Sequence, residues 1–143
     1  MLSKPGKTGP KRKINYPALQ KTLEKAVHAC VEKNPSLGIA FSGGIDSATI
    51  TFIAKKIRPT VPLLVVGTKG SKDVARATAL AKKWKMKLVK KELSVNEIKE
   101  NYALAGKILS TRDHLQQTLG AVNIAIARFA HAQKIHTLMV GSG

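Results

Sequence analysis

The chain has 143 residues, of which 43% are hydrophobic, and 25 Lys and Arg against 8 Asp and Glu give a formal net charge of +17. This length suits one domain with a real core, and the composition argues against a collagen, a disordered chain or a disulfide scaffold. The longest apolar runs are strand-sized, so we predict no membrane span, and the N-terminus lacks the apolar stretch of a signal peptide. Cys30 is the only cysteine, which leaves no internal disulfide and makes a cytoplasmic location the default expectation.

The positive charge is spread along the whole chain. Residues 1–13 hold five bases and no acid, so the rest of the chain still carries 20 bases against 8 acids. Because residues 1–13 are rich in Lys, Gly and Pro without apolar periodicity, we expect a disordered basic arm. The excess charge would attract polyanions such as nucleic acid, although a general compositional bias produces the same excess. Aromatic residues make up only 4% of the chain, which argues against a stacking surface for single-stranded nucleic acid.

Residues 14–143 alternate between helical and strand patterns. The predicted elements, in chain order, are a helix over 19–31, a strand over 37–41, a helix over 50–57, a strand over 62–66, a helix over 74–84, a strand over 87–93, helices over 98–105 and 115–129, and a strand over 137–140. Ser71 is placed to cap the third helix, and Ser94 with Glu97 forms a capping box for the fourth. The strand over 87–93 is more polar than the others, which predicts a position nearer an edge.

Strands separated by helices predict an α/β fold, with right-handed crossovers and a parallel sheet of about four strands covered by helices on both faces. Such sheets bind ligands at the carboxyl ends of their strands. Loops with glycines follow the first, second and fourth strands, at residues 43–44, 67–70 and 141–143. Because parallel strands end at one edge of the sheet, the topology predicts that these three loops converge.

The loop after the first strand carries the sequence SGGIDS at residues 42–47. Gly43 and Gly44 would let backbone N–H groups approach phosphate oxygens, and the following helix adds its positive end. Ser42 and Ser47 can donate hydroxyl hydrogen bonds. Asp46 would repel a bare phosphate, but it suits a magnesium ion that bridges carboxylate and polyphosphate. The alternative interpretation of the same pattern is a tight strand–helix turn with Asp46 as the helix cap.

The loop at residues 42–47 resembles the SGGxDS loop of the N-type ATP pyrophosphatases, the PP-loop superfamily that includes asparagine, NAD and GMP synthetases. Residues 66–73, with the alanines that follow, are similar to the asparagine synthetase segment VGxxGSxDxxxA, and residues 138–143 are similar to the start of that family's next nucleotide loop. NAD synthetases share the first loop, including Ala48, but their next segment is less similar. The resemblance covers roughly residues 36–143 and favours the C-terminal domain of asparagine synthetases, with an adenine nucleotide alpha hydrolase-like, Rossmann-like fold.

This resemblance implies a role for nine residues in binding ATP. They are Phe41, Ser42, Gly43, Gly44, Asp46, Ser47, Val66, Gly67 and Gly141. The loop at 42–47 would hold the pyrophosphate, and Asp46 would bind Mg²⁺ as the catalytic and metal-binding residue. Phe41 and Val66 would lie beside the adenosine, whereas Gly141 would approach the ribose or the α-phosphate. The implied reaction is adenylation of a small carboxylate such as aspartate, after which an amine or ammonia displaces AMP.

Two departures from the family affect this expectation. Glutamine-using asparagine synthetases have a glutaminase domain with a terminal cysteine nucleophile, but this chain has Leu2 at that point and Cys30 in a predicted helix. Ammonia would therefore come from a glutaminase domain or another source in trans. The sequence also stops at Gly143, before the acidic pair that follows the family's last glycine loop, so we expect an incomplete domain over 14–143 with poor turnover alone.

Two other functions stay open at this point. An NAD synthetase-like or RNA-modifying enzyme would have the same fold, and the net charge of +17 favours the RNA-modifying one. A non-catalytic protein that binds nucleotides or nucleic acid is favoured by the missing acidic pair.

Overall fold

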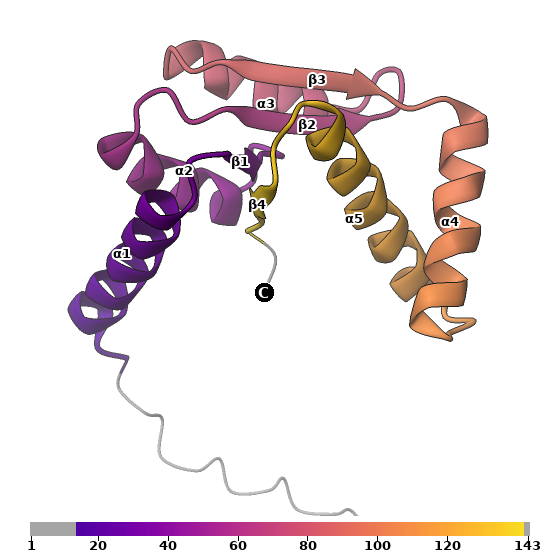
Figure 1. The fold of residues 1–143 in the computed structure, drawn as a ribbon, viewed down its shortest axis with the longest axis horizontal. Helices are drawn as coiled ribbons and strands as arrows, with labels where there is room; N and C mark the ends of the chain where they lie inside the picture. The colour runs from indigo at the N-terminus through magenta and orange to yellow at the C-terminus, as the bar shows by residue number, and fades with distance from the viewer. Residues whose placement is uncertain (1–13, 142–143) are drawn as a thin grey trace, which may run out of the picture.

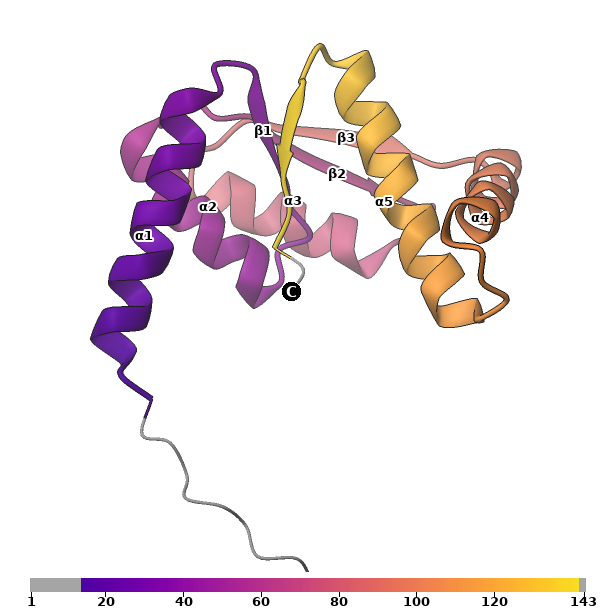
Figure 2. The ribbon, with the colours of Figure 1, turned by 60° about the horizontal axis from the view of Figure 1, so that its bottom comes forward.

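The structure of the protein is a computed structural model that describes residues 14–141. In these residues the strands form a four-stranded parallel sheet in the order β3-β2-β1-β4, and helices cover both faces (Figures 1 and 2). The predicted α/β fold, with its parallel sheet of about four strands, is therefore confirmed. The basic arm predicted over 1–13 lies outside the described residues, as do Ser142 and Gly143.

Each predicted element is present, with ends that differ by a few residues. The elements are α1 (Tyr16–Lys33), β1 (Leu37–Ala40), α2 (Ile45–Ile57), β2 (Leu63–Gly67), α3 (Lys72–Lys83), β3 (Leu88–Glu92), α4 (Val95–Leu109), α5 (His114–Ala132) and β4 (Thr137–Met139). The polar strand β3 lies at one edge of the sheet, as its composition predicts. No helix within residues 14–141 is long and apolar enough to cross a lipid bilayer.

Short polar side chains cap four of the helices, and Asn15 does so for α1 by accepting a hydrogen bond from the Ala18 N–H at 3.1 Å. The Ser71 side chain accepts a hydrogen bond from the first turn of α3, and Ser94 and Glu97 form the predicted capping box of α4. Asp113 caps α5 by accepting bonds from two backbone N–H groups. Since these bonds satisfy amides that have no partner within the helix, the local sequence sets where the helices start.

Side chains of successive strand residues point to opposite faces of the sheet, and each face has its own core. The core on the face of α1, α2 and α3 is the larger one and consists of Val27, Val31, Leu37, Ile39, Phe41, Ile53, Ala54, Val61, Leu63, Val65, Ala77, Ala81 and Met86. The core on the face of α5 consists of Leu64, Ile126, Phe129 and Ala130. The helix α4 packs mainly against α5, so it forms an outer layer of this second face.

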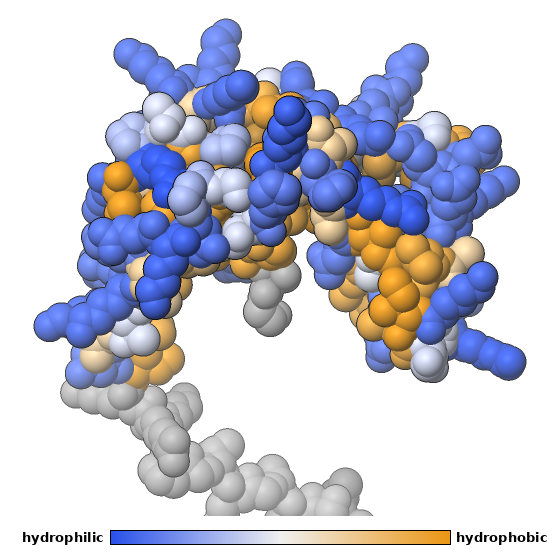
Figure 3. Space-filling model, in the orientation of Figure 1, coloured by the Kyte–Doolittle hydropathy of each residue, from blue (hydrophilic) through white to orange (hydrophobic). Residues whose placement is uncertain are grey.

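The helix α5 covers its face of the sheet only in part. Ile126 and Phe129 are buried, but Leu115, Leu119 and Val122 on the same helix are 68%, 58% and 51% exposed. Apolar side chains consequently border the hollow beneath the sheet on the side of α4 and α5 (Figure 3).

The strand order creates a switch point beside β1. The chain runs from β1 to β2 and β3 in one direction and then returns, so that β4 pairs with the other edge of β1 over residues 37–39. In open parallel sheets the crevice for ligands lies at the carboxyl ends of the strands at this point. The loop that follows β1 is therefore in the position where a ligand would bind.

Candidate functional site

The loop between β1 and α2 is held together by its own serines. The Ser42 hydroxyl accepts a hydrogen bond from the Gly44 N–H at 3.3 Å and lies 3.3 Å from the Ser47 hydroxyl. The Ser47 hydroxyl also donates to the Gly44 carbonyl at 3.2 Å. These bonds close the loop over the first turn of α2.

Gly43 allows this loop to lie directly on α3. Its φ is +72°, a left-handed conformation that favours glycine. A Cβ atom at this position would also lie 3.0 Å from the Ala77 backbone nitrogen and 3.0 Å from the Arg76 side chain. Position 43 thus requires glycine for both its conformation and its close packing.

The end of β4 lies against the same helix terminus. A Cβ atom on Gly141 would be 2.7 Å from the Ser47 nitrogen and 2.9 Å from the Asp46 carbonyl carbon. The loops after the first and fourth strands therefore meet at the start of α2. Gly67 in the second loop packs instead against the side chains of Ser71 and Val74.

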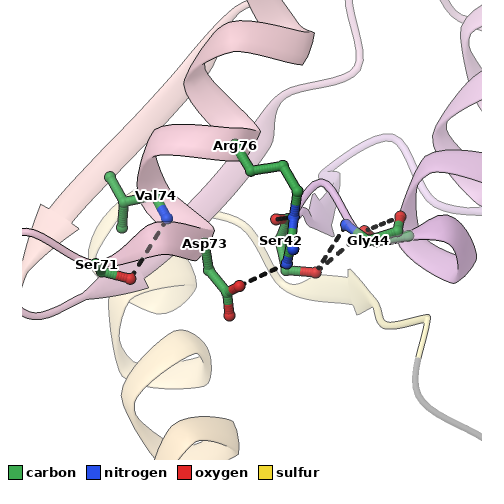
Figure 4. Close-up of polar contacts among 7 residues, drawn as sticks. Ser42, Gly44, Ser71, Asp73, Val74 and Arg76 are labelled. Atoms are coloured by element: carbon green, nitrogen blue, oxygen red, sulfur yellow. Dashed lines mark hydrogen bonds and ion pairs between the residues drawn. The ribbon is translucent and has the colours of Figure 1, made fainter.

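A charged pair on α3 fastens the loop from the side. Arg76 Nε donates to the Ser42 carbonyl at 3.2 Å, and Arg76 Nη2 forms an ion pair with Asp73 at 2.5 Å (Figure 4). Sequence reasoning missed both residues as site candidates. Their spacing of three residues on a predicted helix was the available signal, because such side chains are neighbours on the helix surface.

A cavity of about 520 Å³ opens beside this loop, between the carboxyl ends of β1 and β2 and the exposed part of α5. Its size is in the range of roughly 300–1,000 Å³ that is usual for small-molecule sites. The lining residues are Ala40, Phe41, Ser42, Ser47, Leu64, Val65, Val66, Asp73, Leu119, Val122, Asn123, Ile126, Val140 and Gly141.

The structure places the nine predicted site residues in different surroundings. Five of them line the cavity, namely Phe41, Ser42, Ser47, Val66 and Gly141. Gly43, Gly44 and Asp46 belong to the adjoining loop, and Asp46 is exposed in the first turn of α2. Gly67 lines a separate hollow next to α3 and β3.

Phe41 lines the cavity, but most of its side chain is buried. Its side chain is only 1% exposed and belongs to the core on the face of α1–α3, with its ring 6.0 Å from the ring of Trp84. The strand alternation directs this ring away from α5. Apolar side chains from α5 form a further part of the cavity wall, and the sequence did not reveal that role because their spacing only predicts a helix.

Carboxylates near the site are few. Asp46 lies on the loop and Asp73 lines the cavity. Among residues 14–141, no group of three or more His, Cys, Asp or Glu side chains is placed to hold a metal ion by itself.

Comparisons with known proteins agree with this geometry. Residues 18–143 match the family model for asparagine synthase. A curated relative, "Putative asparagine synthetase [glutamine-hydrolyzing] 1" of Methanocaldococcus jannaschii, is 30% identical over 125 residues, which are 87% of this chain and 23% of the relative. The chain therefore spans about a quarter of that protein.

Solved structures share the fold. An NH3-dependent NAD synthetase from Campylobacter jejuni superposes with a TM-score of 0.61 at 16% identity, covering 92% of this chain and 58% of that one. An NMN synthetase from Francisella tularensis gives 0.59 at 16% identity, covering 90% and 54%. The fold is thus that of NAD synthetase-like PP-loop proteins, and since the family model covers most of the sequence, the chain belongs to the asparagine synthase family.

Proposed function

We propose that the 520 Å³ cavity binds ATP and that this chain is the ATP-binding domain of an amide-forming ligase. One observation carries the proposal: the loop at residues 42–47 and an apolar cavity adjoin one another at the switch point of the sheet. ATP has a polyphosphate end and a purine end. The loop at residues 42–47 would hold the polyphosphate, and the apolar cavity would hold the purine.

The phosphate half consists mostly of backbone. Gly43 and Gly141 let the loop after β1 and the end of β4 pack closely against α3 and the start of α2, and this loop leads into the N–H groups of the first turn of α2. These N–H groups and the positive end of the helix favour an anion. The hydroxyls of Ser42 and Ser47 supply further donors at the cavity wall.

The purine half is formed by side chains from two elements. Val66 from β2 and Leu119, Val122 and Ile126 from α5 line it. Apolar walls suit an adenine ring, and Asn123 on the same helix adds an amide that can donate to and accept from its polar edge. Val66 would contribute backbone groups to the base.

The carboxylates fit a magnesium ion that arrives with the nucleotide. Mg²⁺ commonly binds through one or two carboxylates together with substrate phosphates and water. Asp46 on the loop and Asp73 on the cavity wall would supply those carboxylates. When bound, the ion would neutralise charge on the phosphates.

The reaction proposed for this site is adenylation followed by amide formation. A carboxylate oxygen of a substrate such as aspartate attacks the α-phosphorus, the bond to the bridging oxygen breaks, and pyrophosphate leaves. Ammonia or an amine, from a glutaminase domain or another source in trans, then attacks the acyl carbon and displaces AMP. Residues 42–47 and Gly141 would position the phosphates, so that catalysis rests on orientation and charge neutralisation.

Isothermal titration with ATP and magnesium tests the binding step. We expect the wild-type chain to bind, and Asp46→Ala to bind about tenfold more weakly, because a charge-assisted contact is lost. Titration with EDTA present should remove this difference. Glu100→Ala, which removes an exposed acid on α4, is the matched control and should leave the affinity unchanged.

The results separate the parts of the proposal. Equal affinity of Asp46→Ala and the wild type would contradict the role of Asp46, and failure of the wild type to bind would contradict the site itself. Pyrophosphate release that depends on aspartate and ammonia supports the asparagine synthetase reaction, whereas release that depends on a different carboxylate would contradict it.

A further inference from the structure

A second pocket lies at the C-terminal ends of α2 and α3. It has a volume of about 250 Å³ and is lined by Phe52, Lys55, Lys56 and Trp84. It shares no lining residue with the 520 Å³ cavity. Lys55 and Lys56 are in the last turn of α2, whereas the loop at residues 42–47 is at its first turn. We call this feature the basic aromatic pocket.

Two aromatic rings form one wall of the basic aromatic pocket. The Phe52 side chain sits 54% exposed on α2, and its ring centroid lies 6.4 Å from that of Trp84 at an interplanar angle of 56°. An apolar ring exposed to this degree beside charged side chains gains little from its position in the free protein. A flat ligand that covers the ring would bury this apolar surface and so gain binding free energy.

The pocket is held in place before any ligand arrives. The Lys55 ammonium donates to the Trp84 carbonyl at 2.7 Å, which joins the end of α2 to the end of α3. The Lys56 ammonium lies 4.6 Å from the centre of the Phe52 ring, within the range of a cation–π contact. Trp84 is also anchored to the core through Phe41. The two rings and Lys55 are therefore held in place, whereas the Lys56 ammonium would have to leave the ring for a base to stack on that face.

The surroundings of the pocket are strongly basic. Residues 47–91 contain only one acid, Asp73. The bases of this segment are Lys55, Lys56, Arg58, Lys69, Lys72, Arg76, Lys82, Lys83, Lys85, Lys87, Lys90 and Lys91. Within the part of the chain that the structure describes, none of the lysines at 55, 56, 82, 83, 85 and 87 forms an ion pair.

Helix capping explains some of these lysines but not all of them. Lysines in the last turn complement the negative end of a helix, and Lys55, Lys56, Lys82 and Lys83 are in such turns. Further bases follow α3 at positions 85 and 87, and both are exposed. Neither these two lysines nor the exposed Phe52 ring is accounted for by the helix dipole.

We propose that the basic aromatic pocket binds single-stranded nucleic acid, with one unstacked base against Phe52 and Trp84 and the flanking phosphates on the lysines. Aromatic rings that stack on bases, combined with a basic groove for the backbone, are how proteins bind single strands without sequence preference. In a duplex the bases are stacked inside and do not reach such rings. An anionic lipid surface would be attracted by the lysines, but it has no flat group to stack on Phe52 and Trp84.

The small number of aromatic residues predicts no stacking site, but the fold brings two of them together. The chain has only 3 Phe, 2 Tyr and 1 Trp, too few to predict a stacking surface. Phe52 and Trp84 are separated in the sequence by the end of α2, by β2 and by α3, and only the packing of α2 beside α3 brings them together.

Intrinsic fluorescence tests the proposal directly, because Trp84 is the only tryptophan. The full chain is titrated with twelve-nucleotide oligo-U and oligo-dT, and binding is also followed by anisotropy of the labelled strands. We expect both strands to quench Trp84. Phe52→Leu should weaken binding about tenfold, a cost in the range for one stacked base, whereas Phe52→Tyr should retain it.

A charge variant separates phosphate contacts from stacking. Lys83→Gln, at an exposed position in the last turn of α3, should flatten the plot of log affinity against log salt by about 0.7, the value for one phosphate contact on a single strand. Phe52→Leu should leave that slope unchanged. Tyr16→Leu and Lys107→Gln are the matched controls on α1 and α4, and both should bind like the wild type.

Four results would overturn the proposal. They are binding without a change in Trp84 fluorescence, wild-type affinity in Phe52→Leu, equal affinity for a blunt duplex or for anionic lipid vesicles, and displacement of the strand by saturating ATP with magnesium. The last result would place the strand in the 520 Å³ cavity. None of these outcomes depends on the ligase reaction, so the two proposals fail separately.

Discussion

The two faces of the sheet are covered to different extents. On the face of α1, α2 and α3 a continuous core buries both the strands and the inner sides of the helices. On the other face α5 buries Ile126 and Phe129, whereas Leu119 and Val122 stay more than half exposed. The 520 Å³ cavity lies where that cover is incomplete.

This difference assigns separate tasks to the two faces. The well-covered face fixes the loop at residues 42–47, since Gly43 lies on the backbone of α3 and Arg76 holds the Ser42 carbonyl. The thinly covered face leaves the apolar wall accessible. In the proposed ATP site, the phosphates would meet the loop that α3 holds, and the base would meet the exposed apolar wall of α5.

The largest effect is expected at Gly43, compared with Gly70. Both have a left-handed φ, +72° and +76°, but a Cβ atom at Gly43 would meet the Ala77 backbone at 3.0 Å, whereas one at Gly70 would meet nothing within 4 Å. Gly43→Ala should displace the loop and weaken ATP binding by roughly a hundredfold. Gly70→Ala carries only the conformational cost of a left-handed residue, roughly 1–2 kcal/mol. Titration calorimetry measures the binding, and equal losses in the two variants would show that contact with α3 does not matter.

Substituting one buried isoleucine on each face compares how the two faces contribute to stability and to ATP binding. Ile53→Ala on α2 removes a core side chain and should cost about 2–5 kcal/mol of unfolding free energy without changing ATP affinity. Ile126→Ala on α5 should cost near the lower end of that range, because its site borders a cavity that can adjust. Ile126→Ala should also weaken the binding of ATP and the binding of AMP to the same extent, by about tenfold at most. Urea unfolding and calorimetry give both quantities, and an ATP effect of Ile53→Ala would contradict the division of tasks.

Arg76→Lys tests whether Arg76 orders the loop at residues 42–47 for polyphosphate binding. Lysine keeps the charge but lacks the planar fork that reaches both Asp73 and the Ser42 carbonyl. We expect roughly a fivefold loss of ATP affinity with AMP affinity unchanged, because only the polyphosphate needs an ordered loop. Lys72→Arg at the start of the same helix is the control. A parallel loss for AMP would mean that Arg76 stabilises the whole cavity instead.

The smallest effect concerns the attachment of α4 to the sheet. A hydrogen bond from Lys91, with further bonds from Ser94, lowers the pKa of Glu97 from 4.5 to about 2. The lowered pKa means that this carboxylate contributes stability above about pH 4.5, and that the contribution is lost as the pH falls towards 2. Glu97→Gln should slightly flatten the fall in stability between these pH values. Urea unfolding at pH 5 and pH 3 measures it, with Glu100→Gln on the same helix as the control.

Features set by neighbouring residues could be predicted from the sequence. Apolar spacing identified each helix and strand, and Ser71, Ser94 and Glu97 identified helix starts, since capping involves residues at most a few positions apart. The alternation of elements was enough for the parallel sheet, because a crossover helix leaves few other topologies. The loop at residues 42–47 followed from its glycines and the family motif.

Features that join distant parts of the chain were decided by tertiary structure alone. Helical periodicity shows that Leu119, Val122 and Ile126 share a face, but not that the sheet covers only the last of them. It does not place Arg76 beside Ser42, turn the Phe41 ring away from α5, or bring Phe52 to Trp84. Each of these contacts depends on strand order and on how far each helix extends along the sheet, and neither quantity is encoded in the spacing of residues within one element.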